Sequence, residues 1–255
     1  MMELKNKKII LTGGSSGIGY QLSKKLLREG CSLAVLARRK ERLDKLSDET
    51  KGLGGKLFTY QCDVTEKIQV NNVITEIMKV MGGIDIALLN SGVGRPEGVK
   101  KFKSENAEAV FNTNVLGMVN CIDSLLPVFL QQKHGVIAGV SSLADNRGYS
   151  GSGFYCGSKA AVTAILESLS PELKIHGIKV VTIKPGFVRS EMTAQNNFKM
   201  PFLMDAEKAA DIIVKGLKKE KRIIQFPLMT VIGSKLIGLL PVSLFEYFEY
   251  KRLSG

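Results

Sequence analysis

The stretch KIILTGGSSGIG, from Lys8 to Gly19, decides the fold class of this chain. Its first half is a short apolar run of the kind found in a strand that is buried on both faces. Its second half is a glycine-rich turn that leads into an amphipathic segment. Backbone N–H groups at a helix N-terminus bind phosphate oxygens, and glycines leave room for them. The stretch therefore predicts a first strand, a phosphate-binding turn and a first crossover helix.

Strand and helix patterns alternate along the rest of the chain. Seven β-rich runs are the expected strands: 8–12, 32–37, 56–61, 84–89, 136–140, 178–183 and 222–226. Six amphipathic segments lie between or after them: 17–29, 39–51, 65–81, 104–133, 153–176 and 205–219. This order predicts an α/β fold, a single doubly wound Rossmann domain whose seven-stranded, mainly parallel sheet has helices on both faces. No Pro/Gly/Ser linker divides the chain, so we expect one dinucleotide-binding and catalytic domain at 1–226 and an amphipathic extension at 227–255 packed on it.

Composition narrows the class of protein. The 255 residues are 44% hydrophobic and 24% charged, as in ordinary globular proteins, which excludes disordered and collagen-like chains. Lys and Arg number 36 against 24 Asp and Glu, a net charge of +12 that suits nucleic acid, an anionic membrane or an anionic cofactor. There is no Trp and no stretch that interleaves Arg with aromatic residues, so we expect no nucleic-acid partner. The four cysteines are too few and too widely spaced for a disulfide framework and predict reduced thiols in a cytoplasmic protein: Cys31, Cys62, Cys121 and Cys156.

The glycine-rich turn has two interpretations. As T-G-x-x-x-G-x-G it is one residue longer than the common dinucleotide fingerprint and would bind a pyrophosphate. The residues expected at that phosphate are Gly13, Ser15, Ser16, Gly17, Ile18 and Gly19. The same turn also fits the G-x-S-x-G nucleophile elbow of a serine hydrolase, with Ser15 as the nucleophile. A hydrolase needs a later acid and a histidine, and the only histidines are His134 and His176, each near a predicted helix end.

The end of the second predicted strand indicates which dinucleotide would bind. An NAD site usually has an acidic residue there for the ribose hydroxyls. Here Ala37 is followed by Arg38, Arg39 and Lys40. Guanidinium groups suit a 2′-phosphate, whereas a carboxylate repels it. The sequence therefore favours NADP(H) over NAD(H), with Arg38 and Arg39 as the phosphate ligands; a merely solvated helix start is the alternative.

A tyrosine and a lysine predict acid–base chemistry. Tyr155 and Lys159 are four residues apart in the predicted helix 153–176 and so share one of its faces. Moving a tyrosine pKa from about 10 to ~7 requires about 4 kcal/mol of preferential phenolate stabilisation. One ammonium ~4 Å away supplies about that much at an effective dielectric of ~20. The preceding strand ends at Ser141 and Ser142, either of which can orient a substrate carbonyl beside the tyrosine.

With these residues in place, the chain resembles the short-chain dehydrogenase/reductases, in their NADP-preferring form, over nearly all of residues 1–226. The resemblance depends on these motifs: TGGSSGIG at 12–19, Asp63-Val64, LLNSG at 88–92, Asn114, Ser142 thirteen residues before Tyr155, Lys159 and Pro185-Gly186. Two positions depart from the family pattern. Ser91 stands where Asn or Ala is usual, and Ser190 where Thr is commoner; we expect little change from either.

The resemblance implies a role for each matching residue. Tyr155 would be the general acid in reduction, Lys159 would lower its pKa and hold the nicotinamide ribose, and Ser142 would bind the carbonyl oxygen. Asn114 would hold a helix kink and a water on the proton path. The other implied cofactor contacts are Asp63 and Val64 at the adenine, Asn90, Ser91 and Gly92 on the ribose side, and Val188 and Ser190 at the carboxamide. Pro185 and Gly186 are implied to bind the cofactor as well.

Two further segments bear on the substrate and on partners. The loop 187–204 is apolar and rich in Met and Phe, which predicts a hydrophobic ketone or aldehyde; an interface or core loop is an equal alternative. Between residues 227 and 245, eleven of nineteen positions are apolar, and the basic run KGLKKEKR at 215–222 precedes them. Residues 215–250 could therefore contact a membrane surface peripherally, but a tail packed over the pocket or against another subunit is the preferred expectation.

Taken together, the sequence predicts an NADP-dependent carbonyl reductase or alcohol dehydrogenase, with the proton from Tyr155 and no metal. The expected partners are a small carbonyl or alcohol substrate and further copies of the chain in a homodimer or homotetramer. The expected location is the cytoplasm, with peripheral membrane contact as a further possibility. Two alternatives remain open: a non-catalytic NADP(H)-binding redox sensor and a serine hydrolase that uses Ser15.

Overall fold

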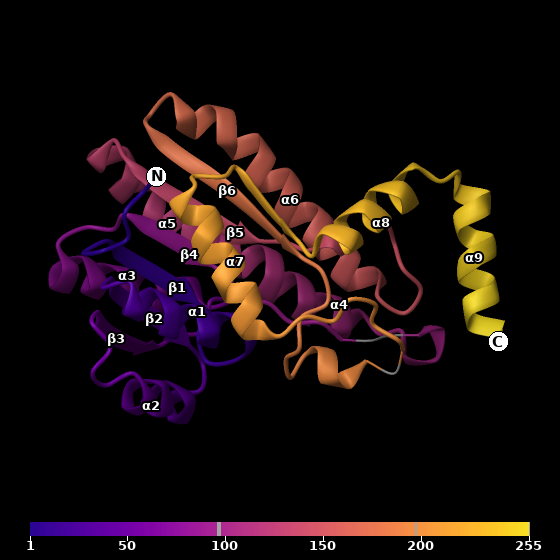
Figure 1. Ribbon diagram of the computed structural model, residues 1–255, viewed down its shortest axis with the longest axis horizontal. Helices are drawn as coiled ribbons and strands as arrows, with labels where there is room; N and C mark the ends of the chain where they lie inside the picture. Colours follow the sequence, from indigo (N-terminus) through magenta and orange to yellow (C-terminus); the bar gives the residue numbers. More distant parts are fainter. Residues whose placement is uncertain (96–97, 197, 255) are drawn as a thin grey trace.

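A computed structural model of the chain describes residues 1–95, 98–196 and 198–254. Seven strands, all paired in parallel, form one sheet in the order β3-β2-β1-β4-β5-β6-β7 (Figure 1). Their bounds are β1 Lys8–Thr12, β2 Ser32–Ala37, β3 Lys56–Gln61, β4 Ile86–Leu89, β5 Gly135–Val140, β6 Ile178–Pro185 and β7 Ile223–Phe226. The predicted doubly wound Rossmann sheet is confirmed, and each strand agrees with its expected range to within two residues.

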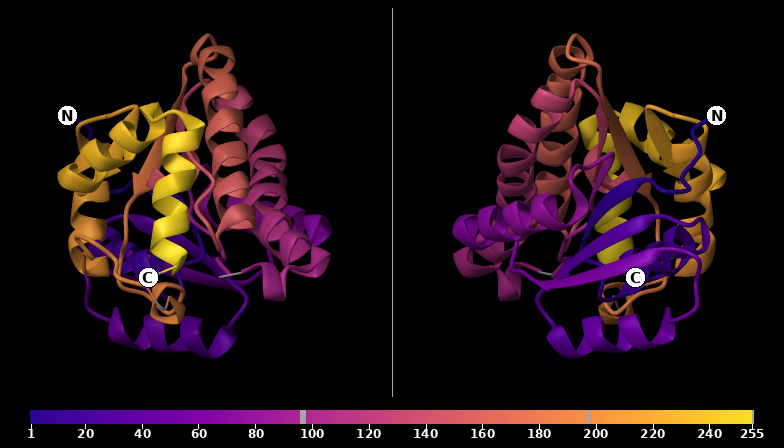
Figure 2. Two further views of the ribbon diagram at one scale, coloured as in Figure 1. Left: turned by 90° about the vertical axis from the view of Figure 1, so that its right-hand side faces the viewer. Right: turned by 90° about the vertical axis from the view of Figure 1, so that its left-hand side faces the viewer.

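Helices cover both faces of this sheet (Figure 2). Helices α1 (Gly17–Arg28), α2 (Lys40–Glu49) and α7 (Ala206–Lys218) pack on one face. Helices α3 (Lys67–Met81), α5 (Gly117–Gln132) and α6 (Gly153–Lys174) pack on the other. Residues of β1 alternate between the two apolar clusters, with Ile9 and Leu11 in one and Ile10 in the other. This double burial explains why β1, like the other central strands, is a nearly continuous apolar run.

The strand order reverses between β1 and β4, and the loops after these strands diverge there. Buried Thr12, the last residue of β1, holds the two loops together. Its hydroxyl accepts the backbone N–H groups of Asn90 at 3.0 Å and of Ser91 at 3.1 Å. Ligands of open α/β sheets bind at such a reversal, outside the carboxyl ends of the strands.

The helix expected over 104–133 is interrupted. Helix α4 (Ser104–Phe111) passes into a π-helical turn, Asn112–Leu116, before α5 begins. Such turns insert a residue into a helix and are frequent at functional sites. The continuous run Ser104–Gln132 is long and apolar enough to cross a membrane by length and composition alone, but α5 supplies core residues on the sheet, as buried helices of ordinary domains do.

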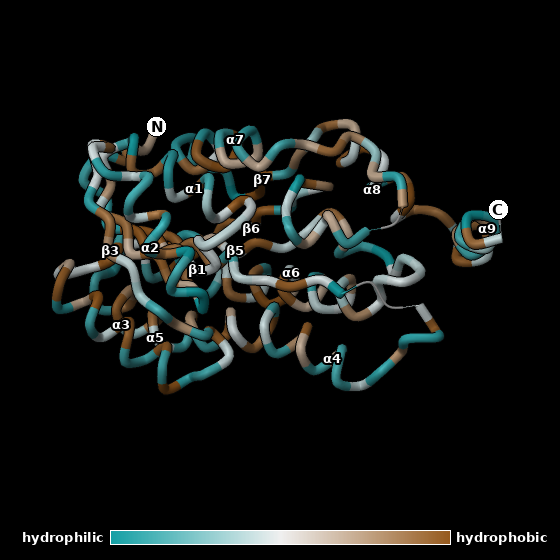
Figure 3. The backbone as a smooth tube through the Cα atoms, turned by 90° about the horizontal axis from the view of Figure 1, so that it is seen from below, coloured by the Kyte–Doolittle hydropathy of each residue, from teal (hydrophilic) through white to brown (hydrophobic). Residues whose placement is uncertain are grey.

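Residues beyond β7 form two helices, α8 (Leu228–Leu239) and α9 (Val242–Ser254). The sequence predicted an amphipathic extension over 227–255 but not its division into two helices. Helix α8 packs against β7 and the turn after β5, and the Ser234 hydroxyl donates to the Leu143 carbonyl at 2.8 Å. Helix α9 stands away from the sheet at one end of the molecule (Figures 1 and 3).

The basic run at 215–222 does not continue into these helices as one surface. Its Lys218 carbonyl accepts the backbone N–H of Met2, and its ammonium pairs with Glu29 at 2.8 Å. Strand β7 then carries the chain from the amino edge of the sheet to the carboxyl edge, where α8 begins (Figure 1). The basic part and the apolar part of residues 215–250 therefore lie at opposite edges of the sheet, and membrane contact through this range stays a prediction.

Candidate active site

A cavity of about 450 Å³ lies at the carboxyl ends of the strands, over the reversal between β1 and β4. All but one of the predicted cofactor residues line it: Gly13, Ser15, Ser16, Gly17, Ile18, Arg38, Arg39, Asp63, Val64, Asn90, Ser91, Gly92, Tyr155, Lys159, Pro185, Gly186, Val188 and Ser190. The exception is Gly19, which lies beneath the turn. An ideal Cβ at Gly19 would stand 2.3 Å from the Gly13 carbonyl oxygen, so this residue lets the turn close on itself.

The turn presents its backbone to the cavity. Gly13 has a φ of +69°, which side chains rarely adopt. Helix α1 begins at Gly17, and the side chain of Ser16, its N-cap residue, does not cap it. The first N–H groups of α1 therefore remain for a ligand, and no acidic residue occupies its first turn. These features fit an anionic group such as a pyrophosphate.

Two arginines, Arg38 and Arg39, line this cavity where α2 begins, and a third, Arg42, follows them in α2. Arg38 pairs loosely with Asp63, at 3.7 Å, and remains largely exposed. Arg39 and Arg42 both pair with Glu191, at 2.9 and 2.6 Å. The hydrogen bond from Arg39 is the largest cause that lowers the pKa of Glu191. Sequence reasoning found Arg38 and Arg39 but missed Arg42 and Glu191, since an ion pair between distant segments leaves no local pattern.

Tyr155 and Lys159 lie together at the inner end of the cavity. The Lys159 ammonium is 5.8 Å from the centre of the Tyr155 ring and donates to the Val140 carbonyl at 2.9 Å. Burial lowers the pKa of Lys159 to about 8. Burial also raises the pKa of Tyr155, and a hydrogen bond with Ser142 acts in the opposite direction. Burial is therefore the dominant influence on the pKa of Tyr155 in this arrangement, and the lowering expected from Lys159 stays a prediction.

The two adjacent serines have different environments. The Ser141 hydroxyl donates to the Lys159 carbonyl at 2.9 Å and pairs with Thr163 at 2.8 Å, so it is engaged in holding α6. The Ser142 hydroxyl accepts the Ala144 N–H at 3.1 Å and borders a second cavity. The geometry therefore favours Ser142 for contact with a substrate.

Asn114 lies behind this group, in the π-helical turn. Its side-chain oxygen accepts the Val93 N–H at 2.7 Å, and its amide donates to the Val93 carbonyl and the Ser158 hydroxyl, both at 2.9 Å. The interrupted helix thus fixes the loop after β4 against α6. This agrees with the kink expected at Asn114.

The second cavity, also of about 450 Å³, is mostly apolar and meets the first at Tyr155. The loop 187–204, called the substrate loop below, supplies Phe187, Met192, Phe198 and Phe202 to the wall of this cavity. The C-terminal helices supply the rest of one side: Met229, Thr230, Gly233, Ser234 and Ile237 from α8, and Glu249 and Arg252 from α9. Sequence reasoning left open whether the tail covers the pocket, and the structure brings it there.

The sequence and the fold are similar to those of known proteins. A sequence model of the family described as short chain dehydrogenase matches residues 7–200. The chain belongs to the short-chain dehydrogenase/reductase family. It is 35% identical over 246 residues to an uncharacterized oxidoreductase of Myxococcus xanthus, covering 96% of this chain and 97% of that one. It is 33% identical over 192 residues to a 3-oxoacyl-(acyl-carrier-protein) reductase of Thermotoga maritima, covering 75% and 78%.

A solved structure shares the fold. A short-chain dehydrogenase/reductase of Burkholderia phymatum in complex with NAD superimposes with a TM-score of 0.85 at 20% identity, covering 92% of this chain and 94% of that one. Within the family pattern, Ser190 keeps a hydroxyl that pairs with Thr193 at 3.3 Å. Ser91 keeps its backbone bond to the end of β1.

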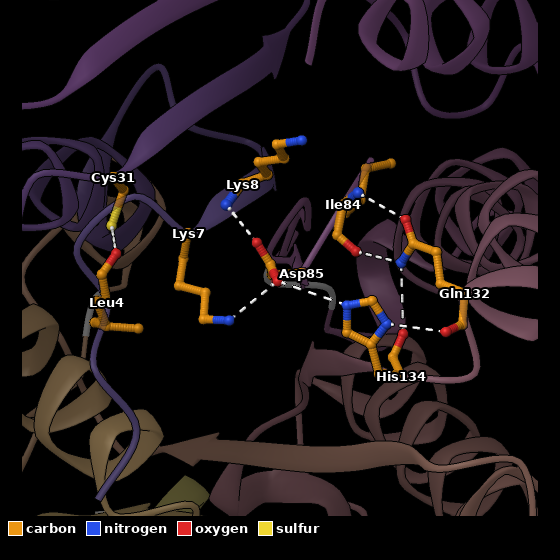
Figure 4. Close-up of polar contacts among 8 residues, drawn as sticks. All are labelled: Leu4, Lys7, Lys8, Cys31, Ile84, Asp85, Gln132 and His134. Carbon is orange, nitrogen blue, oxygen red and sulfur yellow. Dashed lines mark hydrogen bonds and ion pairs between the residues drawn. The ribbon is translucent and has the colours of Figure 1, made fainter. Parts of the chain in front are cut away.

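The serine-hydrolase alternative conflicts with this short-chain dehydrogenase/reductase architecture. Ser15 follows β1 at the carboxyl edge of the sheet, whereas His134 precedes β5 and His176 precedes β6 at the amino edge. A five-residue strand separates the two edges by about 15 Å. Figure 4 shows His134 beside Asp85, which also binds Lys7 and Lys8 at the start of β1; the His134 Nε2 to Asp85 Oδ1 distance is 3.9 Å. No histidine can activate Ser15 in this arrangement, and the alternative is rejected.

Proposed function

We propose that this oxidoreductase uses NADPH to reduce the carbonyl of a hydrophobic ketone or aldehyde, or catalyses the reverse oxidation. The observation that carries the proposal is the position of Tyr155, which borders both the polar cavity at the phosphate-binding turn and the apolar cavity. A group held there can exchange a proton with a substrate in one cavity while a dinucleotide occupies the other. When bound, the nicotinamide supplies or accepts the hydride.

The roles of the surrounding side chains follow from their contacts. Ser142 would donate a hydrogen bond to the carbonyl oxygen beside Tyr155, whose phenol would then protonate that oxygen. Lys159, with its pKa near 8, would hold the nicotinamide ribose and stabilise the phenolate that results. Asn114 would keep the loop after β4 in place and bind a water that reconnects the proton path to solvent. In the oxidation direction the same groups would act in reverse.

NADP(H) is favoured by the charge at the rim of the first cavity. Arg38 is largely exposed there and Arg39 lies 3.5 Å from the Ser15 hydroxyl, so both can reach a phosphate. No acidic side chain follows β2 where a ribose diol would be bound. The cofactor residues named for the first cavity, together with Gly19 beneath the turn, would enclose the rest of the dinucleotide.

A hydrophobic substrate is favoured by the second cavity, whose exposed lining is mostly apolar. Its wall includes three Phe, two Met and one Ile side chain, and the hydroxyls of Ser142 and Tyr155 are among its polar groups. A cytoplasmic homodimer or homotetramer is part of the proposal. Exposed Phe111, Leu116 and Val119, on α4, the π-helical turn and α5, supply an apolar face for a second copy. The molar mass in solution, measured by light scattering, tests the assembly.

Oxidation of NADPH with a panel of ketones and aldehydes tests the activity. Tyr155→Phe should abolish turnover yet leave NADPH binding, followed by nicotinamide fluorescence, nearly intact. Undiminished turnover in that variant would reject the mechanism. If NADPH binds but no carbonyl compound or alcohol is turned over, the redox-sensor alternative would replace the enzyme.

A further inference from the structure

We propose that one end of the molecule docks on an anionic lipid bilayer, and that the apolar cavity takes its substrate from that bilayer. We call this end the distal face and define it as residues 98–103, 198–203 and 228–254. The docking stands on the surface alone, whereas the source of the substrate rests on the proposed function.

The distal face exposes an unusual amount of apolar surface. Helix α8 has one buried residue, Val231, and α9 has none. The exposed large apolar side chains of the two helices are Leu228, Met229, Ile232, Leu236, Leu239, Val242, Leu244, Tyr247, Phe248, Tyr250 and Leu253. Phe198 and Phe202 of the substrate loop, and Val99 and Phe102 before α4, are exposed as well. Soluble monomers rarely expose contiguous apolar surface on this scale without a partner.

The same helices close the apolar cavity on their inner side. Met229, Gly233 and Ile237 of α8 line it, while Leu236 and Leu239 of the same helix point to solvent, 61% and 82% exposed. Phe198 and Phe202 line the apolar cavity and are also exposed to solvent, so the cavity opens to the surface within the distal face. A hydrophobic molecule held against this end would have a short apolar route to Tyr155.

Charge identifies the partner. The distal face carries seven Lys and Arg against two acidic residues: Lys100, Lys101, Lys103, Lys199, Lys235, Lys251 and Arg252 against Glu246 and Glu249. Cations around an apolar patch match the anionic headgroups and acyl chains of a bilayer surface. A second copy docked face to face would bring these cations together, which disfavours self-association there. At twelve residues, α8 is too short to span a bilayer, which takes ~20, so the contact is peripheral.

Flotation with lipid vesicles tests the docking. The intact chain should float with vesicles that contain phosphatidylglycerol, and added salt should weaken the binding. Leu236→Glu with Leu239→Glu should weaken binding at least tenfold, because it removes two apolar contacts and adds two negative charges. The matched control is Ile68→Glu with Ile175→Glu, at exposed positions of 77% and 82% outside the distal face; it should float like the parent.

Lys100→Ala with Lys101→Ala tests the electrostatic part and should weaken binding by about tenfold or more. Failure of the intact chain to float, or equal flotation with pure phosphatidylcholine vesicles, would overturn the assignment. A variant that changes the molar mass in solution but not vesicle binding would overturn it in favour of a contact between copies.

The source of the substrate is tested with two ketones, one short and water-soluble and one long-chain and incorporated in vesicles. The variant Leu236→Glu with Leu239→Glu should lose at least tenfold in turnover of the vesicle-bound ketone and keep turnover of the soluble one. Equal turnover of both ketones by parent and variant would overturn this part. If the parent floats but reduces neither ketone, the proposed function fails while the docking stands.

Discussion

Glu191 offers a sharp test of the proposed NADP(H) preference. Its carboxylate pairs with Arg39, which lines the cofactor cavity, and with Arg42, which follows it in α2. A 2′-phosphate bound by Arg39 would have to compete with this carboxylate and lie close to its charge. The change Glu191→Gln removes the competitor and retains the size of the side chain. We expect it to tighten NADPH binding relative to NADH binding.

The magnitude follows from the exposure of the pair. Half of the Glu191 side chain is exposed, so each of its two ion pairs contributes about 0.2–1 kcal/mol. Release of Arg39 alone should therefore favour NADPH by about 1 kcal/mol, or roughly fivefold in Kd. Glu191→Gln also removes the contact between the substrate loop and α2. This loss should weaken the binding of NADPH and NADH alike and therefore cancel in the ratio of the two dissociation constants.

Fluorescence titration of NADPH and NADH gives the two dissociation constants and their ratio. Glu207→Gln is a suitable control, because Glu207 also loses an ion pair, 3.1 Å from Lys25, but lies outside the cavity. An unchanged or reduced preference for NADPH in Glu191→Gln would show that Arg39 does not bind the phosphate.

Three further predictions concern the framework of the site. Lys159→Met should abolish turnover but raise the free energy of unfolding at pH 7 by about 1–2 kcal/mol, because burial lowers the Lys159 pKa to about 8 and so disfavours the charged lysine in the folded state. In urea unfolding, the stability difference between variant and parent should shrink as the pH rises from 8 toward 10.5, where the unfolded state also loses the proton. Gly19→Ala should destabilise the chain by about 1–3 kcal/mol, because its Cβ would meet the Gly13 carbonyl, whereas Gly148→Ala, with open space around it, should be neutral in the same assay. Thr12→Val should lower the free energy of unfolding by about 2–4 kcal/mol and weaken dinucleotide binding, because it leaves two N–H groups of the loop after β4 without an acceptor. Unchanged thermal stability of this variant would contradict the prediction.

Local patterns predicted most of the fold. Short β-rich runs located all seven strands, most clearly the central ones, because β1, β2, β4 and β5 are buried on both faces and consist mainly of apolar residues. The period of hydrophobic residues merged α4 and α5 into one helix, because a π-helical turn such as Asn112–Leu116 inserts a residue without breaking the apolar pattern. Helix α9 was missed because none of its residues is buried, and a helix without a buried face has no period to detect.

The site was predictable where its chemistry lies in short motifs. Tyr155 and Lys159 are one helical turn apart, and the glycines of the first turn are adjacent in the chain, so spacing alone brings each group together. Pairs formed across the fold were not predictable: Arg42 with Glu191, or the wall that α8 adds to the apolar cavity. The electrostatic state of Tyr155 also depends on burial, which residue spacing does not report.

Helix α8 is a single layer between two environments, with the apolar cavity on one side and solvent on the other. A substitution that tilts or shifts it to suit a new contact outside must also reshape the pocket, and a substitution that enlarges the pocket must move the outer face. Changes in substrate specificity and in membrane localisation are therefore expected to occur together during evolution of this chain, while the residues of the dinucleotide-binding half of the sheet need not change.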